Sequence, residues 1–134
     1  MTATITITNP ILSGMNPDPS WIWDDEFQRI VLVTSTFELV PGLPIYVSED
    51  MTCWKHVSNV IDADLARRLL IPFVDDSGGV YAPTLRRIHG KYVIACTIAR
   101  LDDRRAMEGG CTESELMRFH AAEGNFILEA DSIE

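Results

Sequence analysis

The stretch TLRRIHGKYVIACTI (residues 84–98) predicts a β-hairpin, and strand-like runs continue on both sides of it. Its two arms, 84–88 and 91–98, contain β-branched and aromatic residues, which favour extended backbone. His89 and Gly90 stand between the arms as a two-residue turn. The hairpin predicts antiparallel pairing between strands that are neighbours in the chain.

Further strand patterns lie upstream of the hairpin. The segment RIVLVTSTF (29–37) is largely β-branched, which is typical of a strand buried on both faces. TITIT (4–8) and CWKHVSNVI (53–61) alternate, as half-buried strands do. No strand–helix–strand unit stands out, so we expect an all-β meander. The expected blade strands are 20–24, 29–36, 44–48, 53–60, 83–88, 91–98 and 125–131.

Four strands followed by three more are the pattern of successive blades in a β-propeller. We therefore expect one four-stranded blade and most of a second. A propeller typically has at least four blades, so these strands are expected to be part of a larger propeller. The strand in NFILEA (125–130) would then present an unpaired backbone edge and apolar side chains.

Two segments interrupt the strand pattern. DADLARRLLIP (62–72) has Leu65 and Leu69 four residues apart behind a capping Asp62, which predicts a short helix that Pro72 stops. The charged segment 101–124, punctuated by glycine, is expected to be a long excursion between paired strands with a helix-prone centre.

Composition narrows the class of protein and its partners. With 134 residues, 46% hydrophobic and 23% charged, the chain fits one globular domain. Its formal net charge of −9 disfavours nucleic acid and anionic membranes as partners. No run approaches the roughly 18 apolar residues of a membrane span. The N-terminus lacks a secretory pattern, and three widely spaced cysteines suggest reduced thiols, which favours a cytoplasmic location. A processed secreted chain would also lack its signal, so secretion stays open.

The stretch NPDPS (16–20) holds Asp18 between two prolines. Each proline fixes its own φ and biases the residue before it toward extended backbone, so Asp18 is held from both sides. Such stiffness suits a carboxylate whose position matters for catalysis or binding. Asn, Pro, Asp and Ser are also turn residues, and an ordinary turn is the competing interpretation.

Other polar residues give weaker signals. The three histidines form no pair with metal-ligand spacing, so we expect no metal and no cofactor. The hydroxyl run TST (34–36) could hold a nucleophile, but no G-x-S-x-G elbow surrounds it. The acids of the first turn, Asp24, Asp25 and Glu26, are expected to be solvated.

Three blocks of the sequence together resemble glycoside hydrolase family 43. They are NPILSGMNPDPSW (9–21), VTSTFELVPGLPIYVSEDMTCWKHV (33–57) and DSGGVYAPTLRRIHGKYVIACT (76–97). Their order is that of the N-terminal blades of β-xylosidases and α-L-arabinofuranosidases, and with residues 125–134 they span almost the whole chain. The resemblance implies a five-bladed β-propeller, of which residues 1–134 would be the N-terminal part, truncated at the C-terminal end.

The resemblance also implies roles for single residues. Asp18 corresponds to the general base of an inverting glycosidase, at the bottom of the central pocket. Phe37, in TSTFE, corresponds to a phenylalanine beside the terminal sugar, although core packing would explain it equally well. Tyr81, in GGVYAP, lies where many relatives carry tryptophan. Gly78 and Gly79 are expected either to allow a close approach of strand to pocket or to serve a simple turn.

In the family, the glutamate general acid and the aspartate that tunes it come later than the blocks matched here. Glu129 and Glu134 stand in a different motif context, so the isolated chain is expected to be inactive. Three functions compete: a portion of a glycosidase acting on xylo- or arabino-oligosaccharides, a carbohydrate-binding relic, and an interaction module built from blades. The residues do not distinguish a xylosidase from an arabinofuranosidase. The open edge is expected to cause self-association or to require a complementary C-terminal fragment.

Overall fold

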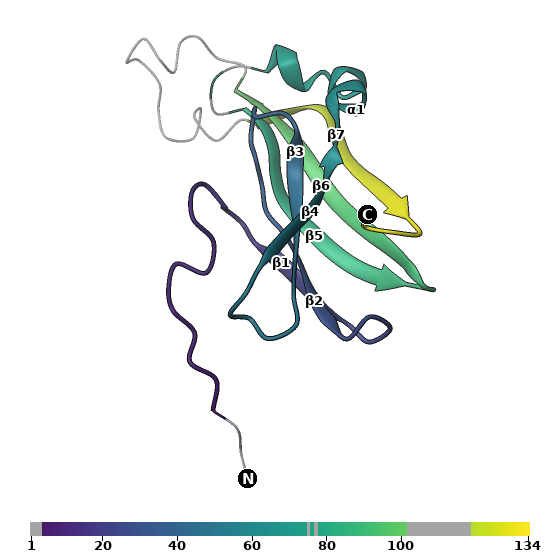
Figure 1. The fold of residues 1–134 in the computed structure, drawn as a ribbon. Coiled ribbons are helices and arrows are strands. Elements are labelled where there is room, and N and C mark those ends of the chain that lie inside the picture. Colours follow the sequence, from purple (N-terminus) through teal and green to yellow (C-terminus); the bar gives the residue numbers. More distant parts are fainter. Residues whose placement is uncertain (1–3, 75, 77, 102–118) are drawn as a thin grey trace.

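The computed structural model describes residues 4–74, 76, 78–101 and 119–134, whose strands form two antiparallel sheets (Figure 1). The first sheet has the order β1-β2-β3-β4 and the second β5-β6-β7. The predicted meander, with one four-stranded blade and three strands of a second, is therefore confirmed. The strands are β1 (Ser20–Asp24), β2 (Arg29–Val33), β3 (Gly42–Ser48), β4 (Lys55–Ile61), β5 (Gly79–Ile88), β6 (Lys91–Leu101) and β7 (Phe119–Ala130).

The hairpin of β5 and β6 forms as its turn residues predict. Ile88 pairs with Lys91, and the two residues between them, His89 and Gly90, have φ of 49° and 82°. Two-residue hairpin turns of the commonest type need positive φ at both central residues, a conformation that glycine adopts without strain. The turn therefore sets the register of β5 against β6 from the hairpin end as far as Thr84 and Ala95.

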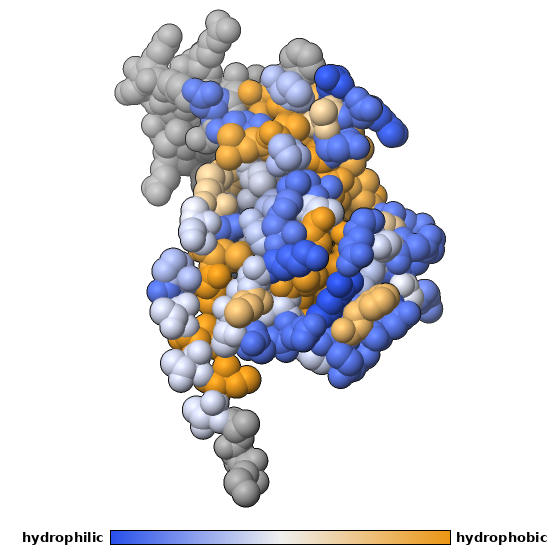
Figure 2. Space-filling model, in the orientation of Figure 1, coloured by the Kyte–Doolittle hydropathy of each residue, from blue (hydrophilic) through white to orange (hydrophobic). Residues whose placement is uncertain are grey.

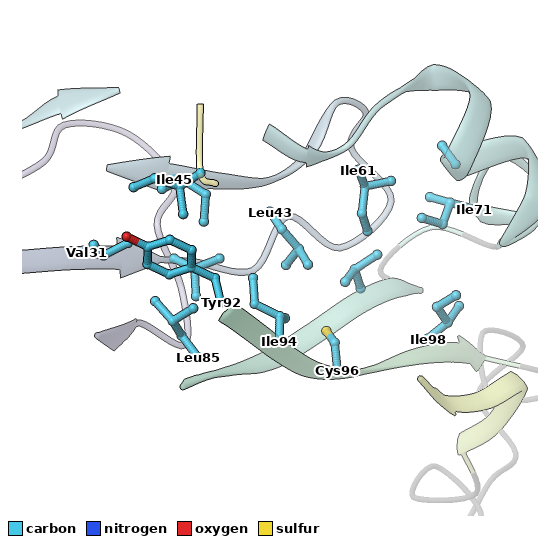
Figure 3. Close-up of a cluster of buried hydrophobic side chains, with 14 residues drawn as sticks. Val31, Leu43, Ile45, Ile61, Ile71, Leu85, Tyr92, Ile94, Cys96 and Ile98 are labelled. Atoms are coloured by element: carbon cyan, nitrogen blue, oxygen red, sulfur yellow. The ribbon is translucent and has the colours of Figure 1, made fainter. Parts of the chain in front are cut away.

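The hydrophobic core lies between the two sheets (Figure 3). Leu43, Ile45 and Ile61 of the first sheet are buried against Leu85 and Ile94 of the second. Burying one such side chain contributes about 1.5–3 kcal/mol. Contact between the sheets is therefore the main source of stability in this part of the molecule.

The predicted short helix is confirmed, and its cap is the expected residue. The helix α1 (Ala63–Arg68) begins after Asp62, whose carboxylate accepts the Leu65 N–H at 2.8 Å. A 3₁₀ turn, η1 (Ile71–Phe73), follows and contains Pro72. The expectation that Pro72 stops the helix is wrong, because α1 already ends at Arg68 and Leu70 follows with a φ of 58°, in the left-handed region where helices commonly end.

The strand β2 ends at Val33, three residues earlier than predicted. Residues 34–36 are buried like strand residues, but they leave the ladder of the first sheet and approach β5. A continuous β-branched run predicts burial and extension, but it does not say which neighbour the backbone pairs with.

Two further predictions about where strands lie are wrong. Residues 4–8 form no strand and are exposed, although TITIT alternates; the N-terminal segment is an extended trace in Figure 1. Within the predicted excursion 101–124, Leu101 pairs with Phe119 and both strands are longer than expected. The expected helix-prone centre at 102–118 lies outside the described residues.

A bridge of two hydrogen bonds joins the sheets just beyond β2. The Phe37 N–H donates to the Val80 carbonyl at 3.1 Å, and the Val80 N–H donates to the Phe37 carbonyl at 2.8 Å. Gly79 allows this approach, because a Cβ there would lie 2.0 Å from the Phe37 carbonyl oxygen and its φ is +100°. Gly79 therefore serves a close approach, of β5 to the Phe37 backbone, rather than a simple turn. Nearby, the Leu85 N–H donates to Ser20 Oγ at 3.0 Å.

A buried carboxylate joins the sheets at the other end of β1. Asp24 was expected to be solvated, and that prediction is wrong, because its side chain is fully buried. It accepts hydrogen bonds from Arg87 and from the Tyr92 hydroxyl of the second sheet. Arg87 also pairs with Glu26, which is exposed as predicted, like Asp25. A buried charge requires partners of this kind, because an isolated one is very costly.

Each sheet exposes apolar side chains on the face turned away from the core. Trp21 and Trp23 of β1 are 56% and 43% exposed, and Ile127 of β7 is 70% exposed. Hydrophobic residues accordingly appear at several places on the surface in Figure 2. Among the described residues, no helix has the length and apolar character needed to cross a bilayer.

Replacement of Gly79 by alanine is expected to lower the free energy of unfolding by about 2–5 kcal/mol, because the new Cβ meets the Phe37 backbone. Urea unfolding followed by circular dichroism measures this. Gly90→Ala is the matched control, since Gly90 also has a positive φ, +82°, but no atom within 4 Å of a Cβ. The control should cost about 1–2 kcal/mol. Equal losses in both variants would show that the approach to Phe37 contributes nothing to stability.

Asp24→Asn is expected to destabilise the chain by about 3–5 kcal/mol, because Arg87 would lose a buried counter-charge. Asp25→Asn, a change of the same kind at an exposed neighbour, should stay within about 0.5 kcal/mol. Thermal and urea melts of the two variants give the comparison. A loss for Asp24→Asn as small as that of its neighbour would mean that the buried cluster is not a stabilising link.

Candidate active site

Asp18 lies two residues before β1, at the end of that strand where the two sheets are bridged. Its side chain is exposed, and its φ is 50°. The flanking prolines predicted extended backbone here, and that expectation is wrong, because the chain bends through the left-handed region instead. Aspartate is one of the residues that tolerate this region. The bend brings the carboxylate to Ser35.

Ser35 connects Asp18 to both sheets. It is fully buried just beyond β2, and its N–H donates to the Pro17 carbonyl at 2.9 Å. Its hydroxyl donates to Asp18 Oδ2 at 2.9 Å and accepts the Ala82 N–H of β5 at 2.8 Å. The sequence interpretation considered Ser35 only as a nucleophile and missed this contact. The available signal was its place in a hydroxyl run after an apolar strand, because buried hydroxyls need hydrogen-bond partners.

A β-bulge in β5 presents the Ala82 N–H to Ser35. The three steps from Tyr81 to Thr84 on β5 face only two steps from Thr97 to Ala95 on β6, so β5 carries one extra residue. Ala82 has a φ of 44° within this irregularity. Bulges redirect backbone groups and side chains, and they are frequent beside active sites. Here the bulge directs a backbone donor out of the second sheet toward the first.

Phe37 and Tyr81 form a stacked pair across the same junction. Their ring centroids are 4.4 Å apart, with an angle of 27° between the planes. Both side chains are half-buried, so the pair is accessible from solvent. Burial raises the pKa of Tyr81, and the carboxylates of Glu38 and Asp18 raise it further. The phenol is therefore protonated near neutral pH.

Cys96 of β6 supports the bulge from the core side. Its thiol donates to the Tyr81 carbonyl at 3.0 Å, and burial raises the pKa of Cys96 to about 11. The sulfur is thus held as a neutral donor rather than as a reactive thiolate. Cys53 is free and exposed, and Cys111 lies outside the described residues.

The remaining sequence candidates are not brought to this junction. His56 lies on β4, where its ring and that of Tyr46 meet in an edge-type contact with 5.4 Å between centroids, and His89 is in the hairpin turn. The part of the chain that the structure describes contains no group of three His, Cys, Asp or Glu side chains that could hold a metal ion.

The three residues that the sequence singled out, Asp18, Phe37 and Tyr81, come from three segments, which Ser35 and the backbone bridge bring together. An exposed carboxylate held by a neutral donor can accept a proton from water. Stacked aromatic rings beside it offer a surface for the C–H face of a sugar ring. The arrangement suits base-assisted attack of water on a bound carbohydrate.

Comparison with known proteins identifies the same family. The family model of glycosyl hydrolases family 43 matches residues 7–134. A non-reducing end α-L-arabinofuranosidase from Bacteroides ovatus is 43% identical over 94 residues, which are 69% of this chain and 17% of that protein. A putative β-xylosidase from Escherichia coli is 38% identical over 128 residues, which are 96% of this chain and 20% of that protein.

The fold agrees with these relatives. The solved structure of the Bacteroides ovatus xyloglucan PUL GH43B matches with a TM-score of 0.70 and 30% identity, over 94% of this chain and 21% of that one. The chain thus spans about a fifth of the length of the relatives it matches. Its sheets are the first blade and most of the second of a five-bladed β-propeller, and the chain belongs to glycosyl hydrolase family 43.

Proposed function

We propose that this chain carries the general base, Asp18, and one wall of the active site of an inverting glycosidase. The observation that carries the proposal is the position of Asp18, exposed and bonded to Ser35 at 2.9 Å, beside the stacked rings of Phe37 and Tyr81. The substrates are oligosaccharides derived from xylan or arabinoxylan. Support for that class comes from the family and from relatives named as an arabinofuranosidase and a putative β-xylosidase.

In the proposed reaction, Asp18 takes a proton from a water molecule whose oxygen attacks the anomeric carbon. The bond from that carbon to the leaving oxygen breaks on the opposite face, and a general acid protonates the leaving oxygen. Inverting enzymes hold the two carboxyl groups about 6.5–9.5 Å apart, which leaves room for the water. The Ser35 hydroxyl engages Oδ2 of Asp18, so Oδ1 is the oxygen that receives the proton.

Phe37 and Tyr81 are the proposed substrate contacts. Each brings an accessible ring to the junction, Phe37 from the segment after β2 and Tyr81 from β5. Aromatic faces bury the C–H surface of a sugar without demanding a particular hydroxyl pattern. This pair therefore supports recognition of a pentose ring and is compatible with either a xylosyl or an arabinosyl residue.

The general acid is proposed to come from residues outside these 134. Residues 1–134 would then be the N-terminal part of a catalytic propeller domain and would have no turnover alone. General acid catalysis contributes about 10²–10⁴-fold, so a base without an acid is a poor catalyst. The acid would be supplied within a longer polypeptide or by a complementary chain.

Asp18→Asn tests the assignment of the base. In the assembly that supplies the acid, we expect hydrolysis of aryl β-xyloside or aryl α-arabinofuranoside to fall by about 10²–10⁴-fold. Asp25→Asn, at an exposed turn, should leave the rate unchanged, and NMR of the first sugar released should show the inverted anomer. Turnover that survives in Asp18→Asn would refute the assignment. Turnover by the isolated chain that depends on Asp18 would instead show that the acid lies within these residues.

The edge of the second sheet is the proposed contact with a further strand. β7 is last in the sheet order, and its outer backbone row has no neighbouring strand among the described residues. Ile127 on this strand is 70% exposed. Edges of this kind pair with other chains. The proposed occupant is a second copy of the chain or a complementary C-terminal fragment.

Ile127→Lys is expected to reduce self-association of the isolated chain, because a lysine on an edge strand opposes strand pairing. Size-exclusion chromatography with light scattering measures the change. Ile88→Lys is the control, since Ile88 is 47% exposed but lies at the hairpin end of β5. If the unmodified chain is a sharp monomer with a cooperative, high-midpoint melt, the fragment proposal fails and an independent binding module is favoured.

A further inference from the structure

We propose that Ser35 is a positioning residue for catalysis, which holds the Asp18 carboxylate in one rotamer through a hydrogen-bond chain that begins in the second sheet. The inference rests on the proposed role of Asp18 and adds a residue to it. Ser35 is fully buried, so it acts on the reaction through Asp18 and not by contact with the sugar.

The hydroxyl of Ser35 has a single hydrogen, and its two contacts determine where that hydrogen points. The Ala82 N–H donates to Ser35 Oγ at 2.8 Å and occupies one lone pair. The hydroxyl hydrogen is then directed to Asp18 Oδ2, at 2.9 Å. Because an accepted hydrogen bond polarises the hydroxyl, the bond it donates is strengthened.

Asp18 needs such a partner, because its side chain is exposed. An exposed carboxylate would otherwise rotate and exchange its partners with water. Its backbone is already held, since the Pro17 carbonyl accepts the Ser35 N–H at 2.9 Å. The Ser35 hydroxyl holds the Asp18 side chain as well, through its bond to Oδ2. A misplacement of about 1 Å at a reacting group can cost about 100-fold in rate.

The N–H that orients the Ser35 hydroxyl comes from the other sheet. Ala82 belongs to the bulge of β5, in the second sheet, whereas Asp18 precedes β1 of the first. The second blade therefore sets the orientation of a base that the first blade carries. A change in the bulge that moves the Ala82 N–H should therefore change the orientation of Asp18, because Ser35 contacts both groups.

Three variants separate this role from simple packing. Ser35→Ala removes the hydroxyl, and Ser35→Cys keeps a weaker donor of similar shape. Thr34→Val is the matched control, because Thr34 is the adjacent fully buried residue and its Oγ1 has no hydrogen-bond partner among the described residues. Each is measured in the active assembly that supplies the general acid, with Asp18→Asn alongside.

We expect kcat of Ser35→Ala to fall about 10- to 100-fold with KM within about twofold of the parent, because the base is displaced while the sugar-binding wall stays. The kcat of Ser35→Cys should lie between those of Ser35→Ala and the parent, and the kcat of Thr34→Val should match that of the parent. A kcat within twofold of the parent for Ser35→Ala overturns the inference, as does an equal loss for Thr34→Val. Should Asp18→Asn remain active, the proposed function itself fails, which is a separate outcome.

A second measurement, hydrogen exchange of the Ala82 amide in the isolated chain, needs no activity. The Ala82 N–H donates to Ser35 Oγ at 2.8 Å, so loss of the hydroxyl should remove the protection that this bond gives the amide. Exchange should accelerate at least tenfold in Ser35→Ala and stay unchanged in Thr34→Val. Unchanged exchange in Ser35→Ala would show that the chain of contacts does not exist in solution.

Discussion

The two hydrogen bonds between Phe37 and Val80 are the constraint on which the candidate site depends. They hold the segment after β2 against the start of β5, and that contact brings Ser35 to Ala82 and Phe37 to Tyr81. The bonds form only because Gly79 has no side chain at the point of closest approach. The proposed base, the proposed positioning hydroxyl and the pair of aromatic rings are thus brought together by one backbone contact between the sheets.

Asp18 and Asp24, near the two ends of β1, differ in their hydrogen-bond partners, and this difference separates a structural carboxylate from one that is open to chemistry. Asp24 is fully buried, and the positive charge of Arg87 compensates its own. Asp18 is exposed, and its contact in this chain is the neutral hydroxyl of Ser35. A cationic partner turns a carboxylate into a structural link, whereas a neutral donor orients it and leaves its charge available for a proton. The first acid joins the blades, and the second is placed where chemistry can occur.

Local patterns predicted the meander, the hairpin at 84–98 and the helix after Asp62, because turn chemistry, caps and side-chain periodicity act over a few residues. The family motifs pointed to Asp18, Phe37 and Tyr81. The early end of β2, the bend at Asp18 and the burial of Asp24 were not predicted, since each depends on a partner more than 15 residues away in sequence. TITIT failed for a related reason, because alternation forms a strand only where a neighbouring strand offers its edge.

Native-state hydrogen exchange of the Phe37 and Val80 amides is the most direct test of this account. If the bridge unites the blades, both amides should exchange with the same free energy of opening as the core amides of β2 and β6, in a single cooperative unit. Exchange of Phe37 and Val80 at rates typical of an exposed loop, while both sheets stay protected, would contradict the account. The bridge would then open while the sheets stay packed through their core, and the site would have no fixed geometry.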